Sequence, residues 1–114
     1  MKIETILAAI SVGDIESAIA WYGKLFGRDI DDRPMKEAAE WRLANGGGVQ
    51  LVLDPKRAGQ SMVTIGVRDL EATVTGIKRR GIDPQNRSAT GPYAIAQVTD
   101  PDGNVLTFAQ PKEQ

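Results

Sequence analysis

Two side chains that often carry out chemistry near neutral pH are missing from this sequence, which contains no histidine and no cysteine. Histidine is the commonest general base near neutral pH, and cysteine supplies thiolate nucleophiles and metal ligands. The acid–base candidates that remain are Tyr93, Glu40, Asp54, Lys36 and Lys56. A carboxylate whose pKa is raised by burial could act as a base, but no spacing pairs two of these groups, and Glu40 and Asp54 are expected to be solvated. Serine–histidine and cysteine catalysis are therefore excluded.

Acidic residues gather in the segment 29–33, which reads Asp-Ile-Asp-Asp-Arg, and continue with Glu37 and Glu40. Clustered aspartates can bind calcium, but the loop spacing of an EF-hand is missing. An ion held by carboxylate oxygens of this stretch stays open as an alternative. A strongly cationic ligand would need a more acidic groove than this single local cluster offers.

The composition is that of one ordinary globular domain. The 114 residues are 41% hydrophobic and 25% charged, with 14 basic and 15 acidic side chains. A net charge of −1 creates no field that would gather nucleic acid or an anionic membrane. No apolar run is long enough to span a bilayer, and the first residues lack the pattern of a signal peptide. The absence of cysteine suits a reducing compartment, so we expect a cytoplasmic protein with neither nucleic-acid nor membrane partners.

Two stretches of the chain repeat one pattern at an offset of 55 residues. In each, a helix-capping aspartate precedes a glutamate and apolar residues at helical spacing, and a glycine suited to the left-handed conformation follows. The pattern predicts helices that begin after Asp14 and Asp69 and end near Gly27 and Gly81. Such a repeat indicates two copies of one supersecondary unit. The matched positions are Val12, Asp14, Ile15, Glu16 and Ile19 with Val67, Asp69, Leu70, Glu71 and Val74.

Strand signals surround each predicted helix, so each copy is interpreted as a strand, a helix and then two or three strands. Tight turns separate the later strands, at 45–48 in the first copy and 100–103 in the second. The segment 31–39 is a short edge strand or a loop, and the polar connection 84–92 could border a pocket. The predicted strands cover residues 5–12, 40–45, 48–54, 62–67, 93–99 and 104–110. We expect a single domain made of a first module (1–54), a linker (55–61), a second module (62–110) and a tail (111–114).

This order of elements, with V-G-D-I-E-x-A-x-x-W-Y from Val12 and D-P-D-G-N from Asp100, resembles the vicinal oxygen chelate superfamily. That superfamily includes glyoxalase I, bleomycin-resistance proteins and extradiol dioxygenases. The similarity runs from Lys2 to Gln110. It implies an α+β fold of tandem βαβββ modules, in which curved mixed β-sheets form a cup and the helices pack outside.

Metalloenzymes of this superfamily hold their ion on cup-facing strand positions, which the resemblance places at Leu7, Gln50, Met62 and Thr107. Leucine has no donor atom, a thioether is a weak ligand, and glutamine and threonine are neutral. A hard divalent ion or a zinc-bound water needs carboxylate or imidazole ligands. We therefore expect no metal and no other cofactor, and neither metal-dependent glyoxalase nor dioxygenase chemistry.

The rest of the cup follows from the alternation of side chains along each strand and, on the neighbouring strands, from the resemblance. Trp41 is assigned by its nine-residue distance from Gln50. The wall is mostly apolar, with two aromatic rings and a few neutral hydrogen-bonding groups, which is typical of a small-molecule pocket. Side chains that fill the cup completely are the alternative. The predicted ligand-binding residues are Leu7, Ala9, Trp41, Leu43, Gln50, Val52, Met62, Thr64, Tyr93, Ile95, Gln97 and Thr107.

These features favour a binding protein over an enzyme. Superfamily members without the metal site include resistance proteins that sequester an antibiotic in the cup, commonly as homodimers. The apolar wall suits a flat, largely neutral drug or metabolite, and a metal-independent lyase or isomerase is the alternative function. We expect a homodimer, with the cup formed either within one chain or between two. Trp21, which lies off the apolar stripe of the first helix, could serve the subunit contact.

Overall fold

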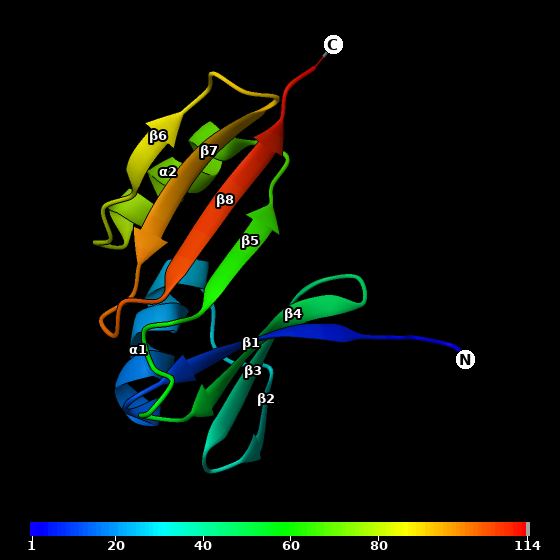
Figure 1. Cartoon of the computed structure of the whole chain (residues 1–114), viewed down its shortest axis with the longest axis vertical. Helices are drawn as coiled ribbons and strands as arrows, with labels where there is room; N and C mark the ends of the chain where they lie inside the picture. Colours follow the sequence, from blue (N-terminus) through cyan, green and yellow to red (C-terminus); the bar gives the residue numbers. More distant parts are fainter. Residues whose placement is uncertain (114) are drawn as a thin grey trace.

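The computed structural model describes residues 1–113, which form two similar halves (Figure 1). The segment 31–39, for which an edge strand and a loop were both open, contributes the short edge strand β2, and the segment 84–92, predicted as a polar connection, contributes the short edge strand β6. The elements in chain order are β1 (Ile6–Val12), α1 (Ile15–Phe26), β2 (Asp32–Met35), β3 (Ala38–Ala44), β4 (Gly47–Leu53), β5 (Met62–Gly66), α2 (Leu70–Arg79), β6 (Gln85–Ser88), β7 (Tyr93–Thr99) and β8 (Val105–Pro111).

Each half forms its own four-stranded sheet, and neither sheet is closed. The first sheet has the order β1-β4-β3-β2 and the second the order β5-β8-β7-β6. In both, the strand before the helix pairs in parallel with the last strand of the half, while the other neighbours are antiparallel. The sheets meet where β5 starts beside the end of β1, and there the backbone N–H of Ser11 donates to Ser61 Oγ at 3.2 Å. This architecture confirms the expected α+β class with mixed sheets.

The two helices start and stop where the capping residues predict. The carboxylates of Asp14 and Asp69 each accept the backbone N–H three residues further on, which satisfies an amide of the first turn. Gly27 ends α1 with a φ of 69°, in the left-handed region that glycine enters without strain. α2 ends at Arg79, two residues before Gly81, whose φ is 91°.

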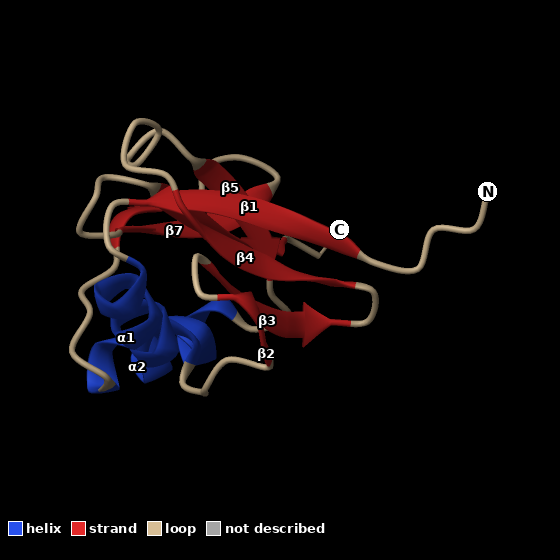
Figure 2. Ribbon diagram, turned by 90° about the horizontal axis from the view of Figure 1, so that it is seen from below, coloured by secondary structure: helices blue, strands red, loops and turns tan. Residues whose placement is uncertain are grey.

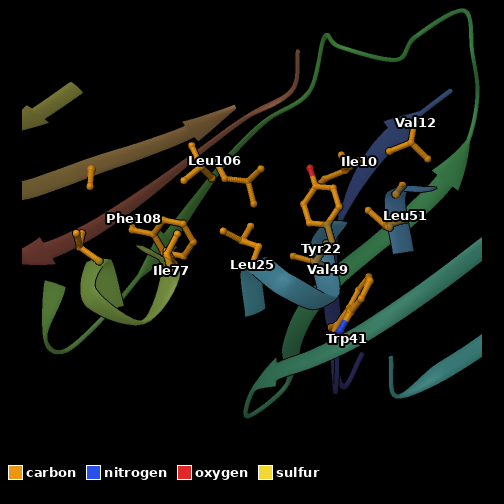
Figure 3. Close-up of a cluster of buried hydrophobic side chains, with 14 of the residues drawn as sticks. Ile10, Val12, Tyr22, Leu25, Trp41, Val49, Leu51, Ile77, Leu106 and Phe108 are labelled. Atoms are coloured by element: carbon orange, nitrogen blue, oxygen red, sulfur yellow. The ribbon is translucent and has the colours of Figure 1, made fainter. Parts of the chain in front are cut away.

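Both helices lie on the same side of the two sheets, so the opposite face of each sheet carries no helix (Figure 2). α1 packs on β3 and β4, and α2 packs on β7 and β8. The apolar stripes of both helices join the inward side chains of the strands in one hydrophobic core (Figure 3). The largest fully buried apolar side chains are Ile10, Val12, Tyr22, Leu25, Trp41, Leu51, Leu70, Ile77 and Leu106.

The edge strands β2 and β6 hold equivalent places in the two halves. Each pairs irregularly with its neighbour, and each sends an arginine to a glutamate in the first turn of the helix of its own half. Arg33 lies 2.7 Å from Glu16, and Arg87 pairs with Glu71. The repeat seen in the sequence therefore extends to the ion pair that anchors each edge strand.

The turn between β7 and β8 carries a buried carboxylate that connects the two halves. Asp100, which is 4% exposed, accepts through Oδ1 the backbone N–H groups of Asp102, Gly103 and Asn104, each at 2.9 Å. Its Oδ2 accepts the hydroxyl of Tyr22, on α1, at 2.7 Å. Burial, followed by this hydrogen bond to Asp100, raises the pKa of the Tyr22 phenol far above its usual range. Tyr22 therefore stays protonated and serves as a permanent donor.

Asn104 uses its whole carboxamide in the same junction and has no exposed surface. Its Nδ2 donates to the carbonyl of Ser11 and to Asp100 Oδ2, both at 2.8 Å. Its Oδ1 accepts the backbone N–H groups of Gly59 and Ser61 at 3.0 and 2.8 Å. One side chain thus ties the last hairpin to β1 and to the segment between the halves, which sets how the two sheets sit relative to each other.

Candidate functional site

The open face of the second sheet carries an apolar groove of about 340 Å³. Its lining side chains alternate with the core residues of β5, β7 and β8, because neighbours along a strand point to opposite faces. Gly66, Ala109 and Pro111 extend the predicted set by continuing this alternation. The groove is lined by Thr64, Gly66, Tyr93, Ile95, Thr107, Ala109 and Pro111.

The groove offers apolar contact, one aromatic ring with its phenol hydroxyl, and the hydroxyls of two threonines. Tyr93 is 51% exposed, so its ring is available to a ligand. Met62 begins β5 on the same face and is 81% exposed. The Oγ of Thr107 accepts a hydrogen bond from Gln97 Nε2 at 2.9 Å, and its own hydroxyl proton remains free to donate. This chemistry suits a neutral, flat molecule held mainly by burial of apolar surface.

The open face of the first sheet carries other residues of the predicted cup. Ala9 pairs with Gln50 across β1 and β4, and Val52 follows two residues later on the same face. On β3, Glu40 pairs with Gln50, whose Nε2 donates to Glu40 Oε2 at 2.9 Å. Leu7 precedes Ala9 on this face and is half-buried. Glu40 is only 9% exposed, so the expectation that it is solvated is wrong.

The predicted place of Trp41 in the cup is wrong. Trp41 has no exposed surface and pairs with Val49, a core residue, so its indole lies on the helix side of the first sheet. Its ring centroid is 5.6 Å from that of Phe26 and 6.3 Å from that of Tyr22. Its Nε1 donates to the carbonyl of Arg28 at 3.1 Å, which satisfies the only polar atom of the buried indole. Of the two aromatic residues predicted for the wall of the cup, only Tyr93 lines a groove on an open sheet face.

Leu43 shares the orientation of Trp41 and packs against the core, so it is also not on the predicted face. It lines a hollow of about 210 Å³ between the two sheets, together with Ala8 and Val49 of the first sheet and Thr64 of the second. This hollow lies beside the apolar groove, because Thr64 lines both.

The four strand positions at which metalloenzymes of the superfamily hold their ion are spread over both sheets of this chain. Gln50 is engaged with Glu40, and Thr107 with Gln97. Within residues 1–113, no three histidine, cysteine, aspartate or glutamate side chains gather in a way that could hold a metal ion. The donor set of the superfamily site therefore does not fit a divalent ion in this chain.

The acidic stretch 29–33 has a structural role through Asp31. Its carboxylate accepts the backbone N–H of Arg42 at 2.7 Å and pairs with Arg28 at 2.5 Å. The hydrogen bond from Arg42, helped by the charge of Arg28, holds the pKa of Asp31 below its usual range. This carboxylate anchors the start of the outer hairpin of the first sheet, through the backbone of Arg42 and the side chain of Arg28.

A polar hollow of about 270 Å³ lies at the edge of the second sheet, where the connection 84–92 contributes two residues, in line with its polar composition. Trp21, half-buried on α1, lines this hollow together with residues that follow α2. The sequence marked Trp21 as unusual but did not indicate this site, because the hollow joins three segments far apart in the chain. Its residues are Trp21, Gly81, Ile82, Asp83, Gln85, Asn86, Gln97 and Thr99.

Solved structures share this fold. A glyoxalase/bleomycin resistance protein from Catenulispora acidiphila DSM 44928 is 30% identical, with a TM-score of 0.90 over 96% of this chain and 99% of that one. The antibiotic-binding protein TnmS3 from Streptomyces sp. CB03234 is 23% identical, with a TM-score of 0.76 over 98% of this chain and all (100%) of that one. The bleomycin-binding protein of Streptomyces verticillus, solved with copper(II)-bleomycin, is 15% identical, with a TM-score of 0.80 over 98% and 99% of the chains.

No curated protein sequence matches the chain. In the described part, residues 1–113, neither helix has the length and apolar character needed to cross a bilayer. A family model, Glyoxalase/Bleomycin resistance protein/Dioxygenase superfamily, matches residues 3–108. The chain belongs to this superfamily, which confirms the resemblance drawn from its sequence.

Proposed function

We propose that this protein binds a flat, largely apolar drug or metabolite on the open face of its second sheet, without a metal and without chemical conversion. The observation that carries the proposal is the apolar groove of about 340 Å³ beside the exposed ring of Tyr93. Its volume lies within the range of small-molecule sites. Structures of the same fold include an antibiotic-binding protein and a bleomycin-binding protein, which supports the binding of a small molecule.

The groove supplies orientation as well as burial. Stacking on the Tyr93 ring is worth about 0.5–1.5 kcal/mol beyond the burial of apolar surface. The hydroxyls of Thr64 and Thr107 lie along the groove and can direct one polar edge of a ring system. No arginine, lysine, aspartate or glutamate lines the groove, so a charged ligand would be buried there without a partner charge, whereas a neutral ligand avoids this cost.

We also propose that the protein is a cytoplasmic homodimer. The groove takes its lining from one sheet only and stays open on its outer side, and Met62 next to it is 81% exposed. A second copy whose own open sheet face covers the groove would enclose the ligand and bury these apolar side chains. Sedimentation at several protein concentrations tests this state, and a monomer at all concentrations contradicts it.

Isothermal titration of planar aromatic antibiotics and aromatic metabolites tests the binding function. Calorimetry is preferred to fluorescence of Trp41, because that indole is in the core. We expect at least one planar compound to bind, Tyr93→Ala to weaken it about tenfold, and Tyr93→Phe to retain it. Thr107→Val removes a hydroxyl of the groove and should weaken the same compound, whereas the matched control Thr75→Val, on the exposed side of α2, should not. Failure of every planar compound to bind, or full binding by Tyr93→Ala, would contradict the proposal.

A metal-independent lyase or isomerase is the second candidate, and Glu40 is the observation that favours it. This carboxylate is 9% exposed and has a single side-chain donor, Gln50, at 2.9 Å. A buried carboxylate facing a cup is positioned to act as a base. Mass spectrometry of a bound compound after long incubation tests this candidate. Product formed by the natural protein and not by Glu40→Gln supports the enzyme, and unchanged compound contradicts it.

A further inference from the structure

The polar hollow beside Trp21 differs in chemistry from the apolar groove. Its eight lining residues include one indole, one carboxylate, three carboxamides and one hydroxyl, and they include no lysine or arginine. Carboxamides and hydroxyls both donate and accept hydrogen bonds, whereas a carboxylate accepts them. This set can satisfy a neutral, hydroxyl-rich group, while Asp83 and the missing cation disfavour a phosphate or a carboxylate.

The hollow and the groove are joined through one side chain. Gln97 lines the hollow, and its Nε2 donates at 2.9 Å to Thr107 Oγ, which lines the groove. Gln97 Oε1 accepts Asn86 Nδ2, at 2.9 Å, on the hollow side. Ile95, another groove residue, lies two positions before Gln97 on the same face of β7. The hollow and the groove are therefore neighbours, and Gln97 with the Thr107 hydroxyl that it contacts lies between them.

Asn86 has an unusual backbone conformation, and its side chain contacts Gln97. Its φ is 54°, in the left-handed region, at the irregular pairing of β6 with β7. Such backbone is sparsely populated by residues other than glycine, although asparagine tolerates it better than most. After its hydrogen bond to Gln97, the Asn86 carboxamide still has one N–H and its oxygen free for a ligand.

We propose that the ligand has two parts: a flat apolar ring system in the groove and a sugar or similar polyol unit in the polar hollow. The hydroxyls of the polyol hydrogen-bond to Asn86, Gln97 and Asp83, and its C–H face packs against the indole of Trp21. This inference rests on the proposed function, because the ring system would occupy the groove described above.

Calorimetric titration of planar aglycones, each matched with its O-glucoside, tests the inference; flavonols and anthraquinones supply such pairs. We expect the glucoside to bind about tenfold more tightly than its aglycone, as one or two added hydrogen bonds would provide. Asn86→Gly removes the carboxamide and suits the positive φ; it should abolish this gain and leave the affinity for the aglycone unchanged. Asn45→Gly, in an exposed loop of the first half, is the matched control.

The outcomes separate this inference from the proposed function. Equal affinities for aglycone and glucoside, or a gain that persists in Asn86→Gly, overturn the two-part ligand and leave the groove proposal standing. Binding of the glucoside but not of the aglycone supports the hollow and contradicts the groove. Methyl glucoside is the third arm: if the free sugar binds as tightly as the glucoside, the hollow is a separate sugar site and the two-part ligand is refuted. If no probe binds, both proposals fail.

Discussion

Replacing Asn104 by alanine is expected to destabilise the protein severely, because this side chain connects the two sheets. It has no exposed surface and makes four hydrogen bonds at 2.8–3.0 Å. Truncation leaves the N–H groups of Gly59 and Ser61 and the carbonyl of Ser11 without partners. It also removes one of the donors that stabilise the buried carboxylate of Asp100.

The size of the effect follows from these groups. Each backbone group left without a partner costs about 1 kcal/mol, and the lost bond to a charged group about 1.5 kcal/mol or more. The free energy of unfolding should therefore fall by about 4 kcal/mol, a large share of the stability of a domain of this size. At about 4 °C for each kcal/mol, the melting temperature should drop by about 15 °C.

Urea unfolding followed by circular dichroism measures this change. The protein concentration is held fixed, because the stability of a dimer depends on it. Asn45→Ala, in the exposed loop between β3 and β4, is the matched control and should stay within about 0.5 kcal/mol of the natural protein. A loss of less than about 1 kcal/mol for Asn104→Ala would refute the reasoning, because the buried bonds would then contribute no more than exposed ones.

Three further predictions follow from single features. Tyr22→Phe removes the hydroxyl donor to Asp100 and should lower the free energy of unfolding in urea by about 1.5–3 kcal/mol. Because the pKa of this phenol is raised only in the folded state, its contribution to stability is complete below about pH 10 and declines as the pH rises further, since the phenol of the unfolded chain then ionises. The variant should therefore lose less stability than the natural protein in alkali. Gly59→Ala forces a Cβ against the carbonyl oxygen of Asp102 at a φ of 90°, so thermal unfolding should show that the free energy of unfolding falls by more than about 1 kcal/mol. Gly91→Ala, with open space around the added Cβ, should be nearly neutral. Elemental analysis of the purified protein should find no tightly bound zinc, nickel, manganese or iron, and one equivalent of any of them would contradict the metal-free interpretation.

The sequence alone predicted the parts of the fold that depend on local physics. The aspartate caps and the terminal glycines fixed α1, because the groups that satisfy the ends of a helix lie within a few residues of it. Alternation along β5, β7 and β8 correctly separated Thr64, Ile95 and Thr107 from the core side chains. These assignments succeeded because side-chain direction in a strand has a strict period of two.

The register of the hairpin formed by β3 and β4 could not be obtained in this way. Near its loop, Ala44 pairs with Gly47, and that register carried inward would place Trp41 opposite Gln50. A bulge shifts the pairing by one residue, so that Glu40 lies opposite Gln50 instead. A shift of one residue reverses the face of every side chain that follows. The indole therefore entered the core, and a carboxylate took the cup position expected for it.

The remaining features depend on contacts between distant segments. The turn 100–103 was recognised from its residue types, but its hydrogen bonds to Tyr22 and, through Asn104, to β1 join positions far apart in the chain. The hollow beside Trp21 likewise combines α1, the start of β6 and the end of β7. Sequence thus determined which local elements form and which strand faces are apolar. Only tertiary packing decided the hairpin register, the junction between the sheets and the polar hollow, because each depends on groups that meet only after the chain has folded.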